Sequence, residues 1–280
     1  MKLQRLFALA AIAALLSGPG PGPALAQSKD YQPQVGQQGK DVIWVPTPDE
    51  VVDRMLTMAQ AKPSDYVVDL GAGDGKIAIA AAKKFGARSL GIEYNPEMAK
   101  HAQGNVEKAG VADKARILQG DIFATDFKSA TVVTMYLLPA LNLKLRPTIL
   151  AMKPGTRIVS HSFTMDDWEP DETSSMDGRR MFFWLVPASV QGNWKVSLAG
   201  GEAFDVTLEQ RFQKLEGTVN LGPILGGLRE TRLSGANIGF TIVDPAGVRR
   251  SFSGTVNGTT MEGAVRADNG AEGRWSAVRR

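Results

Sequence analysis

The segment YVVDLGAGDGK, residues 66–76, places an aspartate and three alternating glycines after a short apolar run. The run contains Asp69 and is β-branched, as expected of a strand that is covered on both faces. Glycines have no Cβ, so they allow a tight turn and a close approach to a ligand. Residues 76–85 predict a helix whose free N–H groups face the same ligand. The arrangement predicts a small polar ligand at the carboxyl end of a parallel strand. The three glycines are Gly71, Gly73 and Gly75.

Acidic side chains follow the next two predicted strands. Glu93 ends the predicted strand 88–93, and Asp121 comes shortly after the predicted strand 115–119. A carboxylate at the tip of the second strand can accept both hydroxyls of a ribose. A carboxylate after the third strand can accept a hydrogen bond from an adenine amino group. The glycine spacing differs from the nicotinamide fingerprint G-x-G-x-x-G, so a nicotinamide-dependent oxidoreductase is an alternative that the acidic positions do not favour.

The elements that position these residues alternate from Asp41 to Pro187. Pro96 and Gly110 stand where a first-turn proline and a C-terminal glycine of one helix belong. The alternation predicts an α/β fold with a mainly parallel sheet. Residues 180–186 predict one more strand, at the end of that sheet. The predicted helices are 49–61, 76–85, 96–109 and 141–152, and the predicted strands are 66–70, 88–93, 115–119, 130–136 and 156–163.

After Pro187 the pattern changes to short strands separated by glycine-containing turns. This spacing predicts an antiparallel all-β domain, closed as a barrel or folded as a sandwich. We place the boundary near residue 188, between domains at 42–187 and 188–280. Three similar segments, LEGTV, FSGTV and MEGAV, indicate either internal repetition or convergent hairpin chemistry. The predicted strands are 194–198, 203–213, 217–221, 238–243, 251–256, 260–265 and 273–277.

The first domain resembles the class I S-adenosylmethionine-dependent methyltransferases in three motifs, in order: VVDLGAGDGK, GIEYN and QGDIF. The resemblance implies a Rossmann-like sheet with helices on both faces and S-adenosyl-L-methionine as cofactor. It implies that Asp69 and the loop 71–75 hold the methionine moiety and that Glu93 binds the ribose. Asp121 with Ile122 is then expected at the adenine. The cofactor-binding residues so expected are Thr47, Asp69, Gly71, Ala72, Gly73, Gly75, Glu93, Tyr94, Asp121 and Ile122.

Two further segments, 45–56 and 132–147, resemble a prokaryotic branch of one group of lysine methyltransferases. That group includes the mitochondrial enzymes that modify the adenine nucleotide translocase and the c-subunit of ATP synthase. The likeness covers roughly residues 42–187 and leaves the β-rich domain without an explanation. It implies N-methylation of a protein lysine. A small amine acceptor stays open, because those enzymes carry a membrane-associated segment before the catalytic domain, where this chain has a signal-like segment instead.

The same resemblance suggests contacts at both ends of the cofactor. In that group the loop before the glycine turn covers the cofactor, so Pro46 and Thr47 are expected to contact it. The tip of the fourth strand faces the methyl group, so Tyr136, Leu137 and Pro139 are candidates for the acceptor site. Tyr136 and Pro139 are therefore the predicted catalytic residues, with Tyr136 bonded to the amine or merely packed at a strand end.

Residues 1–26 have the three parts of a secretory signal, namely a charged start, an apolar middle and an A-x-A cleavage site. The apolar part is too short to span a bilayer. We therefore expect a periplasmic or secreted protein, a flexible linker at 27–41 and no transmembrane segment in the mature chain. A cytoplasmic location is the alternative if the start or the signal is misassigned. An exported, non-catalytic binding protein with a ligand-binding β-domain is the alternative function, because the cofactor is made in the cytosol.

Composition and the histidine positions bear on which partners and metals to expect. The formal net charge is only +3, which gives no electrostatic reason to expect a nucleic acid. Cysteine is absent, so the chain forms no disulfide. Its two histidines, His101 and His161, have no partners at metal-ligand spacing. We expect His101 at the surface and His161 in a structural role.

Overall fold

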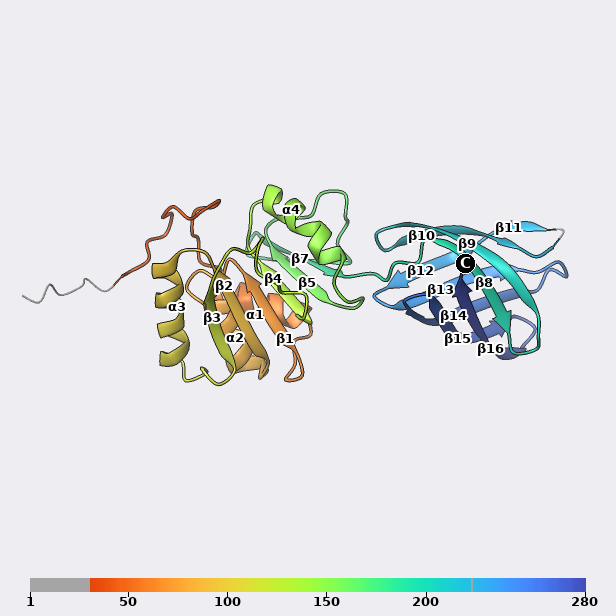
Figure 1. The fold of residues 1–280 in the computed structure, drawn as a ribbon, viewed down its shortest axis with the longest axis horizontal. Coiled ribbons are helices and arrows are strands. Elements are labelled where there is room, and N and C mark those ends of the chain that lie inside the picture. Colours follow the sequence, from red (N-terminus) through yellow and green to blue (C-terminus); the bar gives the residue numbers. More distant parts are fainter. Residues whose placement is uncertain (1–30, 223) are drawn as a thin grey trace, which may run out of the picture. The chain divides into compact units, whose positions relative to one another are not determined.

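The structure is a computed structural model that describes residues 31–222 and 224–280 (Figure 1). The predicted signal segment 1–26 lies outside these residues. The described residues form a mixed seven-stranded sheet with helices and an antiparallel nine-stranded sheet. Both parts of the predicted fold class are confirmed. Among residues 31–222 and 224–280, no helix combines the length and apolar composition needed to cross a bilayer.

The first sheet has the strand order β3-β2-β1-β4-β5-β7-β6. Strands β1 to β5 run parallel, and β7 is antiparallel to both β5 and β6. The order reverses at β1, which pairs with β2 on one side and β4 on the other. Open α/β sheets bind their ligands at such a reversal. The bounds are β1 Tyr66–Leu70, β2 Arg88–Glu93, β3 Ala115–Gln119, β4 Val132–Met135, β5 Arg157–His161, β6 Glu172–Met176 and β7 Arg179–Leu185.

One expectation for this sheet is wrong. The strand predicted from residues 180–186, now β7, is not at the end of the sheet, because β6 pairs with its outer side. The β6 sequence ETSSM is polar and largely exposed, so it lacks the apolar pattern by which a strand is recognised.

Within the part of the chain that the structure describes, helices α1 to α4 position the strands (Figure 1). Neighbouring residues of a strand point to opposite faces, and in β1 Val67 packs with α1 and α2 while Val68 packs on the α4 side. Helix α3 packs beside β3 through Val106 and Ala115. Helices therefore cover both faces of the sheet, as predicted. The bounds are α1 Asp49–Met58, α2 Lys76–Phe85, α3 Pro96–Lys108 and α4 Pro139–Leu150.

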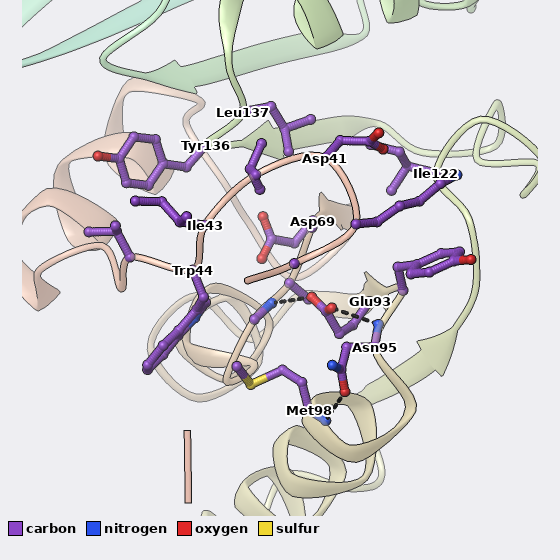
Figure 2. A pocket seen from close by; sticks show the side chains of 18 of the residues that line it. Asp41, Ile43, Trp44, Asp69, Glu93, Asn95, Met98, Ile122, Tyr136 and Leu137 are labelled. Atoms are coloured by element: carbon purple, nitrogen blue, oxygen red, sulfur yellow. Dashed lines mark hydrogen bonds between the residues drawn. The ribbon is translucent and has the colours of Figure 1, made fainter. Parts of the chain in front are cut away.

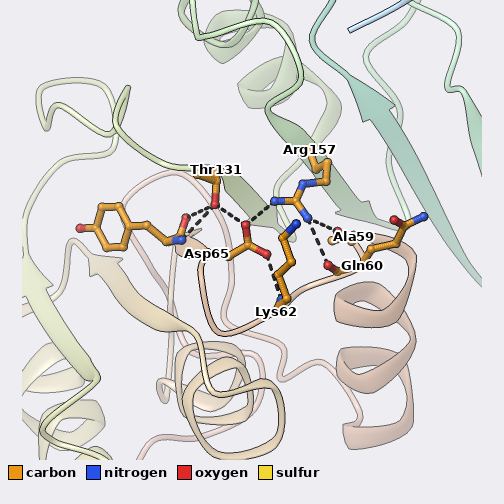
Figure 3. Close-up of polar contacts among 7 residues, drawn as sticks. Ala59, Gln60, Lys62, Asp65, Thr131 and Arg157 are labelled. Atoms are coloured by element: carbon orange, nitrogen blue, oxygen red, sulfur yellow. Dashed lines mark hydrogen bonds and ion pairs between the residues drawn. The ribbon is translucent and has the colours of Figure 1, made fainter.

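A buried ion pair ties the amino ends of the central strands to the end of α1 (Figure 3). Arg157 pairs with Asp65 and donates to the carbonyls of Ala59 and Gln60 at 2.8 and 3.1 Å. The Thr131 hydroxyl donates to Asp65 at 2.8 Å. Burial alone would raise the pKa of Asp65, but Arg157 and Thr131 lower it below the usual range. This network lies at the sheet edge opposite the carboxyl ends of the parallel strands.

The second sheet has the order β11-β10-β9-β8-β16-β15-β14-β13-β12. Its two ends approach each other, because Leu228 donates to the Gly217 carbonyl at 2.8 Å and Thr231 donates to the Leu215 carbonyl at 2.6 Å. Of the two predicted alternatives, the domain is therefore a nearly closed barrel. The bounds are β8 Gly192–Leu198, β9 Ala203–Arg211, β10 Lys214–Asn220, β11 Leu225–Gly227, β12 Arg229–Ser234, β13 Asn237–Val243, β14 Arg249–Asn257, β15 Thr260–Ala267 and β16 Glu272–Arg279.

Aromatic side chains fill the barrel interior. The rings of Phe240 and Phe252 stack with centroids 4.8 Å apart, and Trp275 meets both edge-on at 5.6 Å. Trp194 and Phe204 are also buried in this cluster. The interior of the barrel is thus filled by packed side chains rather than open to a ligand.

The three similar segments share a glycine at which strands come very close. Gly254 and Gly263 pair across β14 and β15. A Cβ at Gly263 would lie 1.9 Å from the Ser253 carbonyl oxygen, and one at Gly217 would lie 2.3 Å from that of Thr207. Glycine inside a strand commonly marks close backbone approach or strong bending. The similarity of the segments therefore reflects a common requirement of barrel curvature.

Candidate active site

A cavity of about 320 Å³ lies at the carboxyl ends of β1 to β4. Figure 2 shows the carboxylates of Asp69 and Glu93 near its centre, with Ile43 and Trp44 to one side. The volume falls within the range of about 300–1,000 Å³ that is typical of small-molecule sites. The reversal of strand order at β1 has thus produced a real cavity at the predicted place.

Nearly all of the residues predicted to bind the cofactor line this cavity. Gly75 does not: it precedes α2 with a φ of 83°, and a Cβ there would lie 3.3 Å from the Ala102 Cβ of α3. Its role is to let two helices pack closely. The predicted residues that line the cavity are Thr47, Asp69, Gly71, Ala72, Gly73, Glu93, Tyr94, Asp121 and Ile122.

The glycine loop leaves room that side chains would take. Gly71 and Gly73 have φ angles of 79° and 53°. A Cβ at Gly73 would lie 2.5 Å from Nε1 of Trp44, and one at Gly71 would lie 3.1 Å from Leu137. The loop is therefore a cradle that fits a ligand only as long as these residues are glycine.

Glu93 is held at the tip of β2 by two backbone donors. Its Oε2 accepts the Gly73 N–H and its Oε1 accepts the Asn95 N–H, each at 2.9 Å. Burial raises the pKa of Glu93, and these N–H groups oppose that rise. Each oxygen keeps a second lone pair, which is the acceptor set that two ribose hydroxyls require. Asn95 also caps α3, whose first residue is Pro96, as predicted.

Asp69 is the most deeply buried acid of the cavity, with 3% of its surface exposed. The Thr134 hydroxyl of β4 donates to it at 2.7 Å. The pKa of Asp69 is raised to about 7: burial is the largest cause, the Thr134 hydrogen bond partly offsets it, and the charges of Asp74 and Glu93 add to the rise. A positively charged ligand group beside Asp69 would favour its ionised form. The carboxylate is therefore suited to a cationic ligand.

Asp121 lies at another side of the cavity, next to Ile122. It accepts the Lys40 ammonium at 2.7 Å and the Phe123 N–H at 2.9 Å. The Lys40 bond holds the pKa of Asp121 below its usual range. The carboxylate is thus ionised and has acceptor capacity left for an amino group.

The predicted acceptor residues are placed unevenly. Tyr136 and Leu137 line the cavity, whereas Pro139 is exposed, begins α4 and lies outside the lining. Proline suits that place because its missing N–H would have no helical partner. Leu138 and Phe163 line the cavity instead, and the rings of Phe163 and Tyr136 stack with centroids 6.1 Å apart.

His161 supports this wall from behind. Its Nδ1 lies 3.2 Å from the Thr47 hydroxyl, and its ring centroid lies 4.0 Å from that of Tyr136. Burial lowers the pKa of His161 to about 4, helped by the charge of Arg179, so the ring is neutral at pH 7. Its Nε2 is buried without a hydrogen-bond partner among the described residues. His161 therefore connects Thr47 and Tyr136, which lie in two walls of the cavity. This contact is the structural role that was expected of it.

Sequence reasoning missed a wall that comes in part from residues 27–41, the segment expected to be a linker. Residues 36–44 form a small hairpin, in which Gly36 donates to the Trp44 carbonyl at 2.8 Å and Trp44 donates to that of Gln37 at 2.9 Å. Its residues 37–44 line the cavity. The available signal was the tight Gly39–Val42 turn followed by two apolar residues. Asn95, Met98 and Phe163 are further lining residues that were not predicted.

Comparison with known proteins places this site in a family. Residues 69–172 match the family described as "ANTKMT methyltransferase domain". A protein-lysine N-methyltransferase of Saccharolobus islandicus (strain REY15A) is 45% identical over 142 residues, which are 50% of this chain and 88% of that protein. The adenine nucleotide translocase lysine N-methyltransferase of Mus musculus is 28% identical over 120 residues, which are 42% of this chain and 52% of that protein.

A solved structure supports the same assignment. The RNA methyltransferase from Salinibacter ruber in complex with S-adenosyl-L-homocysteine is 48% identical, with a TM-score of 0.51. The match covers 52% of this chain and 96% of that one. The glycine cradle and the lone pairs left on Glu93 fit an adenosyl cofactor. The chain therefore belongs to the ANTKMT family of class I methyltransferases and is an S-adenosylmethionine-dependent methyltransferase.

Proposed function

We propose that this enzyme methylates the side-chain amine of lysine in a protein. The observation that carries the proposal is the 45% identity to the Saccharolobus islandicus protein-lysine N-methyltransferase, over 88% of that protein. An aromatic wall at the cavity, Tyr136 and Phe163, supports it.

We assign the cofactor contacts as the resemblance implies. Asp69 and the loop 71–73 hold the methionine moiety, Glu93 the ribose, and Asp121 with Ile122 the adenine. When bound, S-adenosyl-L-methionine supplies an activated methyl group. The support is the position of these residues around one cavity and the buried carboxylate of Asp69, which suits a positive charge.

The protein's own contribution at the acceptor end is to bind a neutral amine. An apolar mouth disfavours the ammonium form and lowers the pKa of a lysine that enters it. Tyr136, Leu138 and Phe163 provide such surroundings. Within the described residues the Tyr136 hydroxyl makes no hydrogen bond, so it is free to orient the amine nitrogen toward the methyl group.

A labelling experiment tests the acceptor. Residues 27–280 are incubated with methyl-tritiated cofactor and a cell lysate, and the products are divided for protease and ribonuclease digestion. We expect label that resists ribonuclease, is released by protease and elutes as methyllysine after hydrolysis. The Tyr136→Phe variant should label more weakly while binding S-adenosyl-L-homocysteine normally. Label in nucleosides alone would contradict the proposal.

RNA is the second candidate acceptor, because the 48% identical Salinibacter ruber protein is an RNA methyltransferase. The near-neutral net charge of +3 weighs against it, since RNA-binding surfaces are usually strongly basic. The ribonuclease arm of the same experiment decides between the two.

Export also remains a proposal. Residues 1–26 have the pattern of a secretory signal and lie outside the described residues. A reporter fused after residue 30 should appear outside the cytoplasm, and an otherwise equal fusion without residues 2–26 should not. Retention of both fusions in the cytoplasm would contradict export.

A further inference from the structure

Residues 36–44, the N-terminal hairpin, approach the cavity from a part of the chain outside the matched family region 69–172. Its strands are held by the bridge between Gln38 and Ile43 and by the Gly39 N–H, which donates to the Val42 carbonyl at 2.8 Å. A Cβ at Gly39 would lie 2.4 Å from that oxygen. The turn is therefore tight and specified by its sequence.

The tip of the hairpin is attached to the proposed adenine end of the cavity. Lys40 pairs with Asp121 at 2.7 Å, and its ammonium lies 4.7 Å from the centroid of the Tyr94 ring. Both partners line the cavity and come from the loops after β3 and β2. One side chain thus links the hairpin to two other walls.

The base of the hairpin lies on the glycine loop. Trp44 is so close to Gly73 that its Nε1 would be 2.5 Å from a Cβ there. Figure 2 shows Trp44 and Ile43 beside the region that holds Asp69 and Glu93. The hairpin is therefore attached at both ends of the space assigned to the cofactor.

Apolar surface around this space is left uncovered by the protein. Ile43 of the hairpin is 58% exposed, Tyr94 48% and Leu138 45%, although all three line the cavity. Large apolar side chains gathered around a cavity indicate a ligand that covers them.

The cavity of about 320 Å³ is present with the hairpin in place and with Lys40 on Asp121. Closure of the hairpin and occupation by a ligand are therefore compatible. Asp121 also keeps acceptor capacity beside Lys40. We propose that the N-terminal hairpin is part of the cofactor site and that the Lys40–Asp121 pair holds it closed over the bound cofactor, which slows cofactor release.

The proposal rests on the cofactor placement proposed above, and its test is a binding measurement that needs no acceptor. S-adenosyl-L-homocysteine release from the full chain is measured by stopped-flow displacement, with titration calorimetry for Kd. We expect Lys40→Met to speed release about three- to five-fold, the effect of losing one partly exposed ion pair. Lys40→Arg, which can still pair with Asp121, should release at about the wild-type rate.

Two controls make the result specific. Lys153→Met removes an exposed lysine in the turn after α4, away from the cavity, and should leave release unchanged. Salt should speed release from the wild type more than from Lys40→Met, because salt screens the pair. Unchanged release in Lys40→Met, or tighter binding because Lys40 competes with the adenine, would each overturn the proposal. Failure of the wild type itself to bind S-adenosyl-L-homocysteine would instead overturn the cofactor placement.

Discussion

The two domains use glycine for opposite purposes. In the methyltransferase domain Gly71 and Gly73 keep a loop free of side chains, so that space remains for a ligand. In the barrel Gly254 and Gly263 let two strands approach so closely that no space remains. The missing Cβ therefore leaves a cavity at the carboxyl ends of the strands in the first domain. In the barrel it lets neighbouring strands pack together without one.

The two regions also differ in how they treat buried polar groups. The barrel pairs its buried indoles internally, since Trp194 donates to the Val190 carbonyl and Trp275 to that of Ser253. At the cavity, Asp69 is a buried acid whose pKa burial raises to about 7, and behind the cavity wall the Nε2 of His161 has no partner among the described residues. Unpaired buried atoms occur in both regions, since Nε of Arg279 in the barrel also lacks a partner among these residues, so it is the raised pKa of the Asp69 carboxyl that marks the ligand site.

The largest effect is expected at the sheet edge opposite the cavity. Arg157→Met leaves Asp65 buried without its cation, which should lower the free energy of unfolding by about 3–5 kcal/mol. Because the folded pKa of Asp65 is lowered, its stabilisation is present above the unfolded pKa of about 4 and lost as pH falls below it. Urea unfolding at several pH values measures both effects. A stability within about 0.5 kcal/mol of wild type would contradict the structural role of the pair.

The next effect is expected in the barrel, where a substitution should lower stability without changing cofactor-product binding. Gly263→Ala forces apart strands that leave 1.9 Å for its Cβ, and should cost about 1–3 kcal/mol of stability. The Kd for S-adenosyl-L-homocysteine should not change. Thermal unfolding and calorimetry test the two statements, and Gly270→Ala, at a turn with open space, shows what a loop glycine costs without a clash. A changed Kd would show that the two uses of glycine are not separate.

Gly73→Ala is the converse case. Its Cβ would displace Trp44 and would occupy the left-handed region at a φ of 53°, at a cost of about 1–2 kcal/mol. We expect the Kd for S-adenosyl-L-homocysteine to rise about tenfold, with a smaller change in unfolding temperature than in Gly263→Ala. Normal affinity in this variant would show that the loop is not a ligand cradle.

The protonation of Asp69 should distinguish substrate from product. The cofactor carries a sulfonium charge that S-adenosyl-L-homocysteine lacks, and a positive charge favours ionised Asp69 over the protonated form. Cofactor affinity should therefore rise as pH increases toward about 7, whereas product affinity should change less. The ratio of the two Kd values should shift by up to about tenfold between about pH 5.5 and about pH 8. In Asp69→Asn the ratio should be independent of pH, and an equal slope in both proteins would contradict this role.

The smallest effect is expected at the contact between Thr47 and His161, which lies behind Tyr136 of the proposed acceptor site. Thr47→Val and His161→Asn each remove one side of the 3.2 Å contact, at about 0.5–1.5 kcal/mol. We expect both variants to raise the KM for the acceptor. His161→Asn, whose residue lies outside the cavity lining, should leave the cofactor Kd nearly unchanged, and a double variant should be no worse than the worse single one. His101→Asn is the matched control. Additive losses would show that the two residues act independently.

The sequence was most informative where local pattern and tertiary position agree. Strands 66–70, 88–93 and 115–119 were predicted with their observed bounds. The first two are mostly buried runs between turns, as central parallel strands are, whereas 115–119 is largely exposed at the edge of the sheet. The acids at their ends converge because parallel strands carry their carboxyl ends to one edge. The positions of these acids in the sequence therefore predicted where the cavity lies.

Other features depend on contacts that no local pattern contains. The N-terminal hairpin begins in a polar, glycine-containing segment that resembles a linker, and its contacts with Asp121 and Gly73, which no local pattern contains, place it at the cavity. Closure of the barrel depends on bonds from 228 and 231 to β10, across the ends of the sheet. Pro139 was selected by its place in a motif, yet the first turn of α4 carries it out of the cavity.

The apolar side chains exposed around the cavity have a calorimetric consequence. Ile43, Tyr94 and Leu138 are in contact with water as long as nothing fills the space between them. A ligand that covers them removes apolar surface from water, which makes the heat capacity change of binding negative. Cofactor binding to this enzyme should therefore become more exothermic as the temperature rises.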